Sequence, residues 1–297
     1  MMTQTTPRIG ELLWVMAALA PATLGSGCTT PPERSEVAKI QVAVSVPPQA
    51  YLVEHIGGDR VEIQVMIPPG TSPAVYEPSP RQLVSLSRSQ LFVKVGHPHF
   101  LFEETHLEGV LDWLPNVRVV EMVGNGEEHR GDETEEDPHV WLSPSAMKKT
   151  AVEIAEALAE IDPGHAAEYR QREERLLEEI DRTDKGIRSL LEPLEERSFV
   201  VYHPAWGHFA REYGLEQRAI EQEGKEPSPA RLVQLIELAR DRDVRVIFVQ
   251  EGFSDRGARV IANEIGAEVR ALDPLALDWS ENLLQVATDL RAALAGH

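Results

Sequence analysis

The chain has 297 residues, enough for two ordinary domains with a core each, and its 42% hydrophobic and 26% charged residues are typical of a globular protein. The formal net charge of −20 argues against nucleic acid as a partner, because binding phosphates requires a basic face. Cations are the more natural ligands of so acidic a chain.

The first 28 residues differ in character from the rest. Arg8 precedes a short apolar run, residues 12–24, which is followed by the sequence GSGC. This pattern is typical of an export signal with a small-residue cleavage site, and the run is too short to stay in a bilayer as a permanent helix. We therefore expect a signal peptide over residues 1–27 and a flexible tether over residues 28–38.

Cys28 is the only cysteine, and it stands where a bacterial lipoprotein signal places the residue that receives a lipid. We expect an exported protein in the periplasm or on the outer face of the cytoplasmic membrane, held there by a lipid on Cys28. The alternative is an ordinary cleaved signal with an incidental cysteine. A disulfide within the chain is excluded, because there is no second cysteine.

From residue 39 onward, β-rich runs alternate with helical patterns. Strands are predicted over 39–46, 61–67, 91–95 and 117–123, and helices over 49–58, 81–89 and 100–114. Such an alternation predicts a parallel sheet covered by helices on both faces. An acidic segment with seven carboxylates, residues 124–139, then interrupts the pattern and is a loop by composition.

The middle of the chain is helical. After a helix over 143–161, residues 164–194 carry apolar side chains on one face of a helix about 45 Å long. The alternation then returns, with strands over 198–202, 217–220, 244–249 and 268–272 and helices over 206–213, 228–242, 256–266 and 281–294. We predict an α/β protein with two Rossmann-like lobes of mainly parallel sheet, residues 39–162 and 197–297, joined by a rigid backbone helix within residues 163–196.

Three polar residues follow strands or a loop, where open parallel sheets bind their ligands. His139 follows the acidic segment, His203 comes directly after one predicted strand, and Asp273 directly after another. Two imidazoles and a carboxylate suit a divalent metal such as zinc or manganese. Each residue alone is weak evidence, so the hypothesis depends on all three meeting in a cleft between the lobes.

Six motifs, in order and spacing, resemble the metal-receptor family of ABC importers, the cluster A-I or TroA-like solute-binding proteins. They are PPGTSPAVYEPSPRQL, DPHVWLSP, YHPAWGHFAREYGL, EGKEPSPARL, VIFVQ and LDPL, and the resemblance covers the chain from about residue 39 to its C-terminus. It implies two α/β lobes, a buried metal between them, and ligands at His139, His203 and Asp273. It also implies Zn²⁺ or Mn²⁺ as the transported ligand, an ABC permease with its ATPase as partners, and a monomer.

The chain departs from that family at Ala74, where members generally carry a histidine ligand. Three explanations stay open. A histidine after the third strand replaces the missing ligand, with His97 preferred to His99 because it is closer to the strand end. Alternatively, water or the carboxylate of Glu251 fills the position. Finally, the cleft holds a different solute.

The leading hypothesis is therefore an extracytoplasmic binding protein that captures a divalent metal and delivers it to a permease. The imidazole ligands favour zinc over manganese, which prefers more oxygen ligands. The alternative is a metal-dependent hydrolase with an open zinc position. The sequence offers no HExxH or GxSxG motif and no general base beside the ligands except Glu251, so we expect a protein that is not an enzyme.

Overall fold

The computed structural model describes residues 38–123, 137–221, 227–242, 244–250, 253 and 256–295. Cys28 and nearly all of the acidic segment lie outside these ranges, as does Glu251. Within the described ranges, no helix is both long enough and apolar enough to cross a bilayer.

The N-terminal lobe is built on a parallel sheet with strand order β2-β1-β3-β4. Its strands are β1 (Ile40–Val44), β2 (Val61–Val65), β3 (Leu91–Lys94) and β4 (Arg118–Glu121). Its helices are α1 (Pro47–Gly57), α2 (Pro80–Leu86), α3 (Leu101–His106), α4 (Glu108–Leu111) and α5 (Pro144–Ile161). The near-continuous burial of β1 follows from its central position, where both faces of the sheet are covered.

The C-terminal lobe repeats this arrangement, with strand order β6-β5-β7-β8 and parallel pairing throughout. Its strands are β5 (Ser198–Val201), β6 (Glu216–Ala219), β7 (Val246–Gln250) and β8 (Glu268–Leu272). Its helices are α7 (Gly207–Glu212), α8 (Pro229–Asp241), α9 (Arg256–Ile265) and α10 (Trp279–Leu294). The prediction of two parallel α/β lobes is confirmed.

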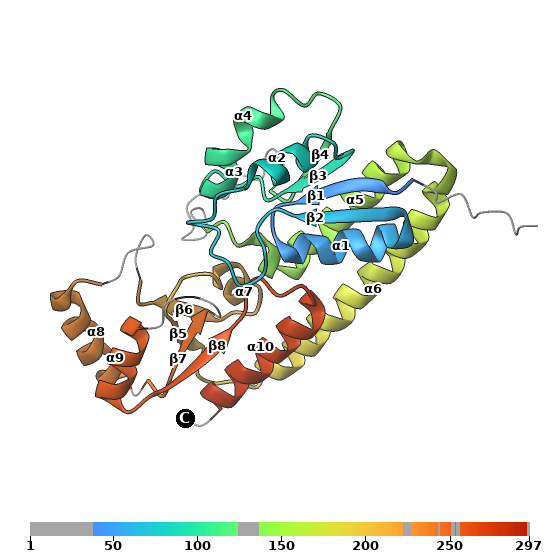
Figure 1. Cartoon of the computed structure of the whole chain (residues 1–297). Coiled ribbons are helices and arrows are strands. Elements are labelled where there is room, and N and C mark those ends of the chain that lie inside the picture. The colour runs from blue at the N-terminus through green and yellow to red at the C-terminus, as the bar shows by residue number, and fades with distance from the viewer. Residues whose placement is uncertain are drawn as a thin grey trace, which may run out of the picture. The chain divides into compact units, whose positions relative to one another are not determined.

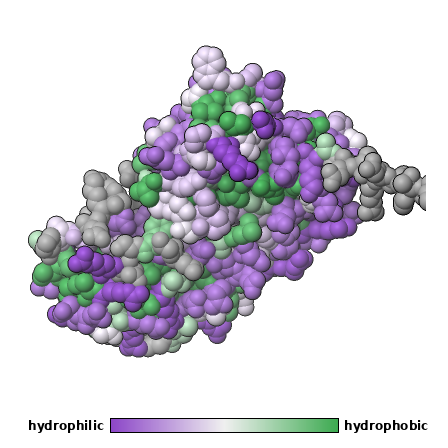
Figure 2. Space-filling model, in the orientation of Figure 1, coloured by the Kyte–Doolittle hydropathy of each residue, from purple (hydrophilic) through white to green (hydrophobic). Residues whose placement is uncertain are grey.

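The predicted backbone helix is α6 (Ala166–Leu191), 26 residues long, which Figure 1 shows running from the first lobe to the second with α10 packed alongside it. One face of α6 is buried, and the members of that face are Tyr169, Leu176, Ile180, Thr183, Ile187 and Leu191. The opposite side forms part of the hydrophilic surface in Figure 2. The helix therefore joins the lobes through an apolar stripe, as the spacing of its apolar residues predicts.

One predicted helix differs from the structure. Residues 100–114 form two short helices, α3 and α4, instead of one, with Leu107 between them at φ −117° and ψ −31°. Leu107 is fully buried. The helical pattern of the sequence does not reveal this break, because tertiary packing can override local helix propensity.

Candidate metal centre

A cavity of about 340 Å³ lies where the carboxyl ends of both sheets meet, and we call it the interlobe cleft. The loop between β2 and α2, the segment after β3, and residues 137–139 contribute from the first half of the chain. Residues after β5, in β6 and at the end of β7 contribute from the second half. The lining residues are Ser72, Pro73, Ala74, His99, Phe100, Leu101, Phe102, Asp137, Pro138, His139, His203, Pro204, Gln217, Gln250 and Phe253.

His139 and His203 meet in this cleft, with ring centroids 5.4 Å apart. His139 stands at the start of a 3-10 turn, residues 140–142, and its ring makes an edge contact with Trp141 at 5.2 Å. His203 lies two residues after β5, at the carboxyl edge of the second sheet. Two imidazoles contributed by different lobes are thus close enough to act on one small ligand.

Each of these two rings has a carboxylate beside its Nδ1 atom. Asp137 Oδ1 lies 2.6 Å from His139 Nδ1 and also accepts a hydrogen bond from the His139 backbone N–H at 3.0 Å. Glu221 Oε2 lies 3.4 Å from His203 Nδ1. Burial acts to raise the pKa of Asp137, but the neighbouring His139 outweighs it, and the pKa of this carboxyl falls below its ordinary value.

Asp273 follows β8 at the same edge of the second sheet, but it is not among the residues that line the cleft. Its Oδ1 accepts a hydrogen bond from the backbone N–H of Leu275 at 2.8 Å, and its carbonyl accepts one from Asn282. The next residue, Pro274, accepts a hydrogen bond from Trp141 Nε1 at 2.7 Å. The segment that carries Asp273 is therefore tied to the segment that carries His139.

His97 and His99 line different cavities. His97 is buried and lines a different cavity with Lys94 and Glu103, whereas the exposed His99 lines the interlobe cleft beside Ala74. The backbone N–H of His99 donates a hydrogen bond to His97 Nδ1 at 3.1 Å. His99, and not His97, therefore lines the interlobe cleft, although the two rings lie only 5.6 Å apart between centroids.

The loop that carries both histidines is held by a buried carboxylate. Glu103 accepts hydrogen bonds from the backbone N–H groups of Val95 and Gly96 at 2.7 and 2.8 Å, and from the hydroxyl of Ser45. Burial raises the pKa of Glu103, although these hydrogen bonds act in the opposite direction. The carboxylate joins the ends of β1 and β3 to α3 and so fixes the start of the His99 loop.

Among the residues that the structure describes, no group of three or more His, Cys, Asp or Glu side chains is already close enough to hold one ion. The rings of His139 and His203 form a pair with centroids 5.4 Å apart. Glu251, the other carboxylate considered from the sequence, lies outside the described residues.

Sequence reasoning missed Asp137 and Glu221. Asp137 belongs to the acidic segment by composition and appears there as one charge among seven, although its position two residues before His139 is a usable signal. Glu221 follows β6, which places it at the same sheet edge as His203. His208 is buried, and its Nε2 lies 2.8 Å from the carbonyl oxygen of Asp137.

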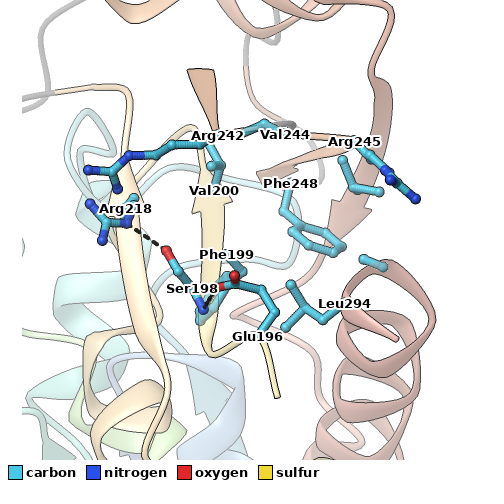
Figure 3. Close-up of a pocket in the computed structure, with 12 residues that line it drawn as sticks. Glu196, Ser198, Phe199, Val200, Arg218, Arg242, Val244, Arg245, Phe248 and Leu294 are labelled. Carbon is cyan, nitrogen blue, oxygen red and sulfur yellow. Dashed lines mark hydrogen bonds between the residues drawn. The ribbon is translucent and has the colours of Figure 1, made fainter. Parts of the chain in front are cut away.

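A second cavity, about 360 Å³, lies at the opposite end of the second sheet and is drawn in Figure 3. Its polar groups largely pair with one another: Arg218 donates to Ser198 Oγ, and Glu196 accepts from the Ser198 backbone N–H. It lies at the amino ends of β5 and β7, whereas open parallel sheets bind ligands at the carboxyl ends. The interlobe cleft is therefore the candidate site.

The chain resembles known proteins along most of its length. The family model described as ZnuA, zinc-uptake complex component A periplasmic, matches residues 42–293. A high-affinity zinc uptake system protein ZnuA of Bacillus subtilis is 28% identical over 290 residues, covering 89% of this chain and 88% of its own. A putative metal-binding protein of Treponema pallidum is 29% identical over 280 residues, covering 87% of each chain.

Solved structures of related proteins share the fold of this chain. A crystal structure of ZnuA superposes with a TM-score of 0.80 at 39% identity, covering 86% of this chain and 99% of its own. A ZnuA deletion mutant with zinc bound superposes with a TM-score of 0.79, also at 39% identity, covering 87% of this chain and 99% of its own.

Proposed function

Because the chain belongs to the family of zinc-uptake complex component A, the solute-binding proteins of ABC zinc importers, we propose that it captures Zn²⁺ in the interlobe cleft and delivers it to a membrane permease with its ATPase. The observation that carries this proposal is the pairing of His139 and His203 across the cleft at 5.4 Å. The family consists of binding proteins and not of enzymes, so the alternative of a metal-dependent hydrolase has no support.

We assign His139 and His203 as the first two ligands and Asp273 as a third. His99 is the proposed N-terminal-lobe ligand in place of the histidine that family members carry at Ala74, because His99 and Ala74 line the same cleft. His97 is less suited to this role. Its Nδ1 accepts a hydrogen bond from the backbone and it lines a different cavity.

Zinc is the favoured cargo, since three imidazoles and one carboxylate form a nitrogen-rich set that suits zinc better than manganese. Manganese is nevertheless compatible with this architecture: a structure described as the binding protein FpvC of Pseudomonas aeruginosa in complex with Mn²⁺ shares the fold. The cation therefore has to be established by direct competition between the two metals.

The test is calorimetric titration of metal-stripped protein with zinc and with manganese. We expect one tight zinc site per chain, weakened at least about tenfold in His139→Ala and in His203→Ala, because each change leaves a coordination position to water. His99→Ala should weaken binding more than His97→Ala. His106→Ala, on a different surface, is the control, and unchanged zinc affinity in both His139→Ala and His203→Ala would refute the site.

The family is extracytoplasmic. Beyond that, we propose that the mature chain begins at Cys28 and is anchored by a lipid there, and that it acts as a monomer. Mass spectrometry of protein isolated from membranes tests the anchor: a lipid-modified Cys28 supports it, and an unmodified mature N-terminus at another residue contradicts it. Light scattering of the soluble part tests the monomer.

A further inference from the structure

The carboxylate behind His139 is built into the fold. The Asp137 side chain is only 7% exposed. Its Oδ1 is within hydrogen-bonding distance of the ring Nδ1 of His139 and accepts a hydrogen bond from the backbone N–H of the same residue. An ionised carboxylate only accepts hydrogen bonds, so the proton of the neutral imidazole must reside on Nδ1. The lone pair of Nε2 is then the one available to a metal.

The position of Asp137 is itself constrained from the other side. Its carbonyl accepts a hydrogen bond from His208 Nε2 at 2.8 Å, and His208 is a buried residue of α7 in the second lobe. The backbone of Asp137 is therefore tied to a helix of the opposite lobe, while its carboxylate contacts His139. A fixed acceptor fixes the direction of the His139 ring as well as its protonation.

His203 has a similar neighbour on its own Nδ1 side. Glu221 Oε2 lies 3.4 Å from His203 Nδ1, and the Glu221 side chain is 13% exposed. This contact is longer than the one at His139, so its effect should be weaker. His139 and His203 thus each have an acidic group beside Nδ1, even though they come from different lobes.

We propose that Asp137 and Glu221 are positioning residues that hold His139 and His203 as Nδ1–H tautomers, with Nε2 of both rings directed at the captured metal. This inference rests on the proposed function and adds the residues that prepare its ligands. Metal-bound histidines commonly donate their second N–H to a carboxylate, and loss of that partner typically weakens metal binding about 10- to 100-fold. Asp137, at the shorter contact, should carry the larger share.

The first measurement needs no variant. Nitrogen-15 NMR of the metal-free protein near neutral pH reports which ring nitrogen of each histidine carries the proton. We expect the Nδ1–H form for His139 and His203. If metal-free His139 is predominantly the Nε2–H form, the inference is overturned, whatever the variants do.

The second measurement is zinc affinity by competition titration. Asp137→Ala should weaken zinc binding about 10- to 100-fold and shift His139 toward the Nε2–H form, whereas Asp137→Asn, which keeps a neutral acceptor, should fall between Ala and wild type. Glu221→Gln should have a smaller effect in the same direction. Asp162→Asn is the matched control, because Asp162 faces His165 Nδ1 at 2.8 Å in the same kind of pair away from the cleft.

The outcomes separate the two proposals. Zinc affinity within about twofold of wild type in Asp137→Ala and Glu221→Gln, with His139→Ala and His203→Ala still impaired, refutes the positioning role and leaves the metal site intact. Unimpaired binding in His139→Ala and His203→Ala refutes the site itself. Equal weakening by Asp162→Asn and Asp137→Ala, with the His139 tautomer unchanged, would make the effect one of general stability and also overturns the inference.

Discussion

Ala74 sits in a tight turn in which the Ser72 carbonyl accepts hydrogen bonds from the N–H groups of Val75 and Tyr76. The turn is further held by the Tyr76 hydroxyl, which donates to Gln82 at the start of α2. Ala74 lines the interlobe cleft and offers only a methyl group, which cannot bind a metal. Under the proposed function, the residue at this position therefore affects how many protein ligands the metal can have.

A histidine at position 74 should be able to take over the role proposed for His99. We expect Ala74→His to raise the zinc affinity of the His99→Ala variant at least about tenfold, because the new imidazole replaces the water molecule left at that coordination position. Competition titration checks this. Val75→His is the matched control, since Val75 is the adjacent residue, is 79% exposed and does not line the cleft. An equal gain from both variants, or none from Ala74→His, would contradict the assigned geometry.

His208 gives a prediction about stability and pH. Burial lowers its pKa, and its neutral form suits its surroundings: Nε2 donates to the Asp137 carbonyl, and Nδ1 faces an Arg211 nitrogen at 3.3 Å. The unfolded chain takes up a proton here at a higher pH than the folded chain does. The contribution of His208 to stability is therefore complete above the unfolded pKa of about 6.5 and is lost as the pH falls below it.

Urea unfolding of metal-free protein at about pH 7.5 and about pH 5.5 measures this loss. The free energy of unfolding should fall between the two conditions, and His208→Gln should show a smaller fall, because an amide does not titrate. If the free energy of unfolding of His208→Gln depended on pH as strongly as that of the wild type, His208 would make no contribution to this dependence. Metal-free protein is essential, since bound zinc would add its own pH dependence.

At the scale of the element, the fit of α1 against α6 depends on the glycine that ends α1. Gly58 has φ 53° and ψ −134°, a conformation that glycine adopts far more readily than other residues. A Cβ at this position would lie 1.8 Å from Arg172 Nη1 of α6. The absence of a side chain therefore allows both the chain reversal and the close approach of the arginine.

Gly58→Ala should lower the free energy of unfolding by about 1–3 kcal/mol for the backbone strain, with a further cost for displacing Arg172. Gly266→Ala separates the two effects, because Gly266 also has a positive φ, 78°, but a Cβ there would meet nothing within 4 Å. Urea unfolding should rank Gly58→Ala as clearly the less stable. Equal stabilities would mean that the contact with Arg172 relaxes without cost.

Across the whole described structure, one hydrophobic cluster connects the two lobes. It extends from β1 through α5 and α6 to Phe199, Phe248 and the buried face of α10, while residues of β7, α8 and α9 pack into a second cluster of their own. Two tryptophans add directional contacts: Trp141 Nε1 donates to the Pro274 carbonyl, and Trp279 Nε1 donates to the Trp141 carbonyl, both at 2.7 Å. We therefore expect only modest movement of the lobes when metal binds.

Trp141→Phe tests this junction. The change removes the N–H donor to the Pro274 carbonyl and leaves a space in the core, because the Trp141 side chain is fully buried. The free energy of unfolding should therefore fall by about 2–4 kcal/mol. Zinc affinity should fall as well, because the variant lacks the hydrogen bond that holds the segment of Asp273 against the segment of His139. Trp113→Phe is the control, since Trp113 is 84% exposed. A stable variant with normal zinc affinity would show that the hydrogen bond is dispensable.

The layout of the chain can be predicted from its residues: alternating apolar runs and helical faces specify two parallel α/β lobes and a joining helix, and the strand ends mark where ligands gather. Local periodicity carries this information, because each strand and helix shows its buried face in its own residues. The folded chain was needed to show that His99 and not His97 lines the cleft, and that Asp137 and Glu221 lie beside Nδ1 of His139 and His203. These choices depend on loop conformation and on hydrogen bonds between distant segments, such as His208 to Asp137, which no repeat in the sequence records.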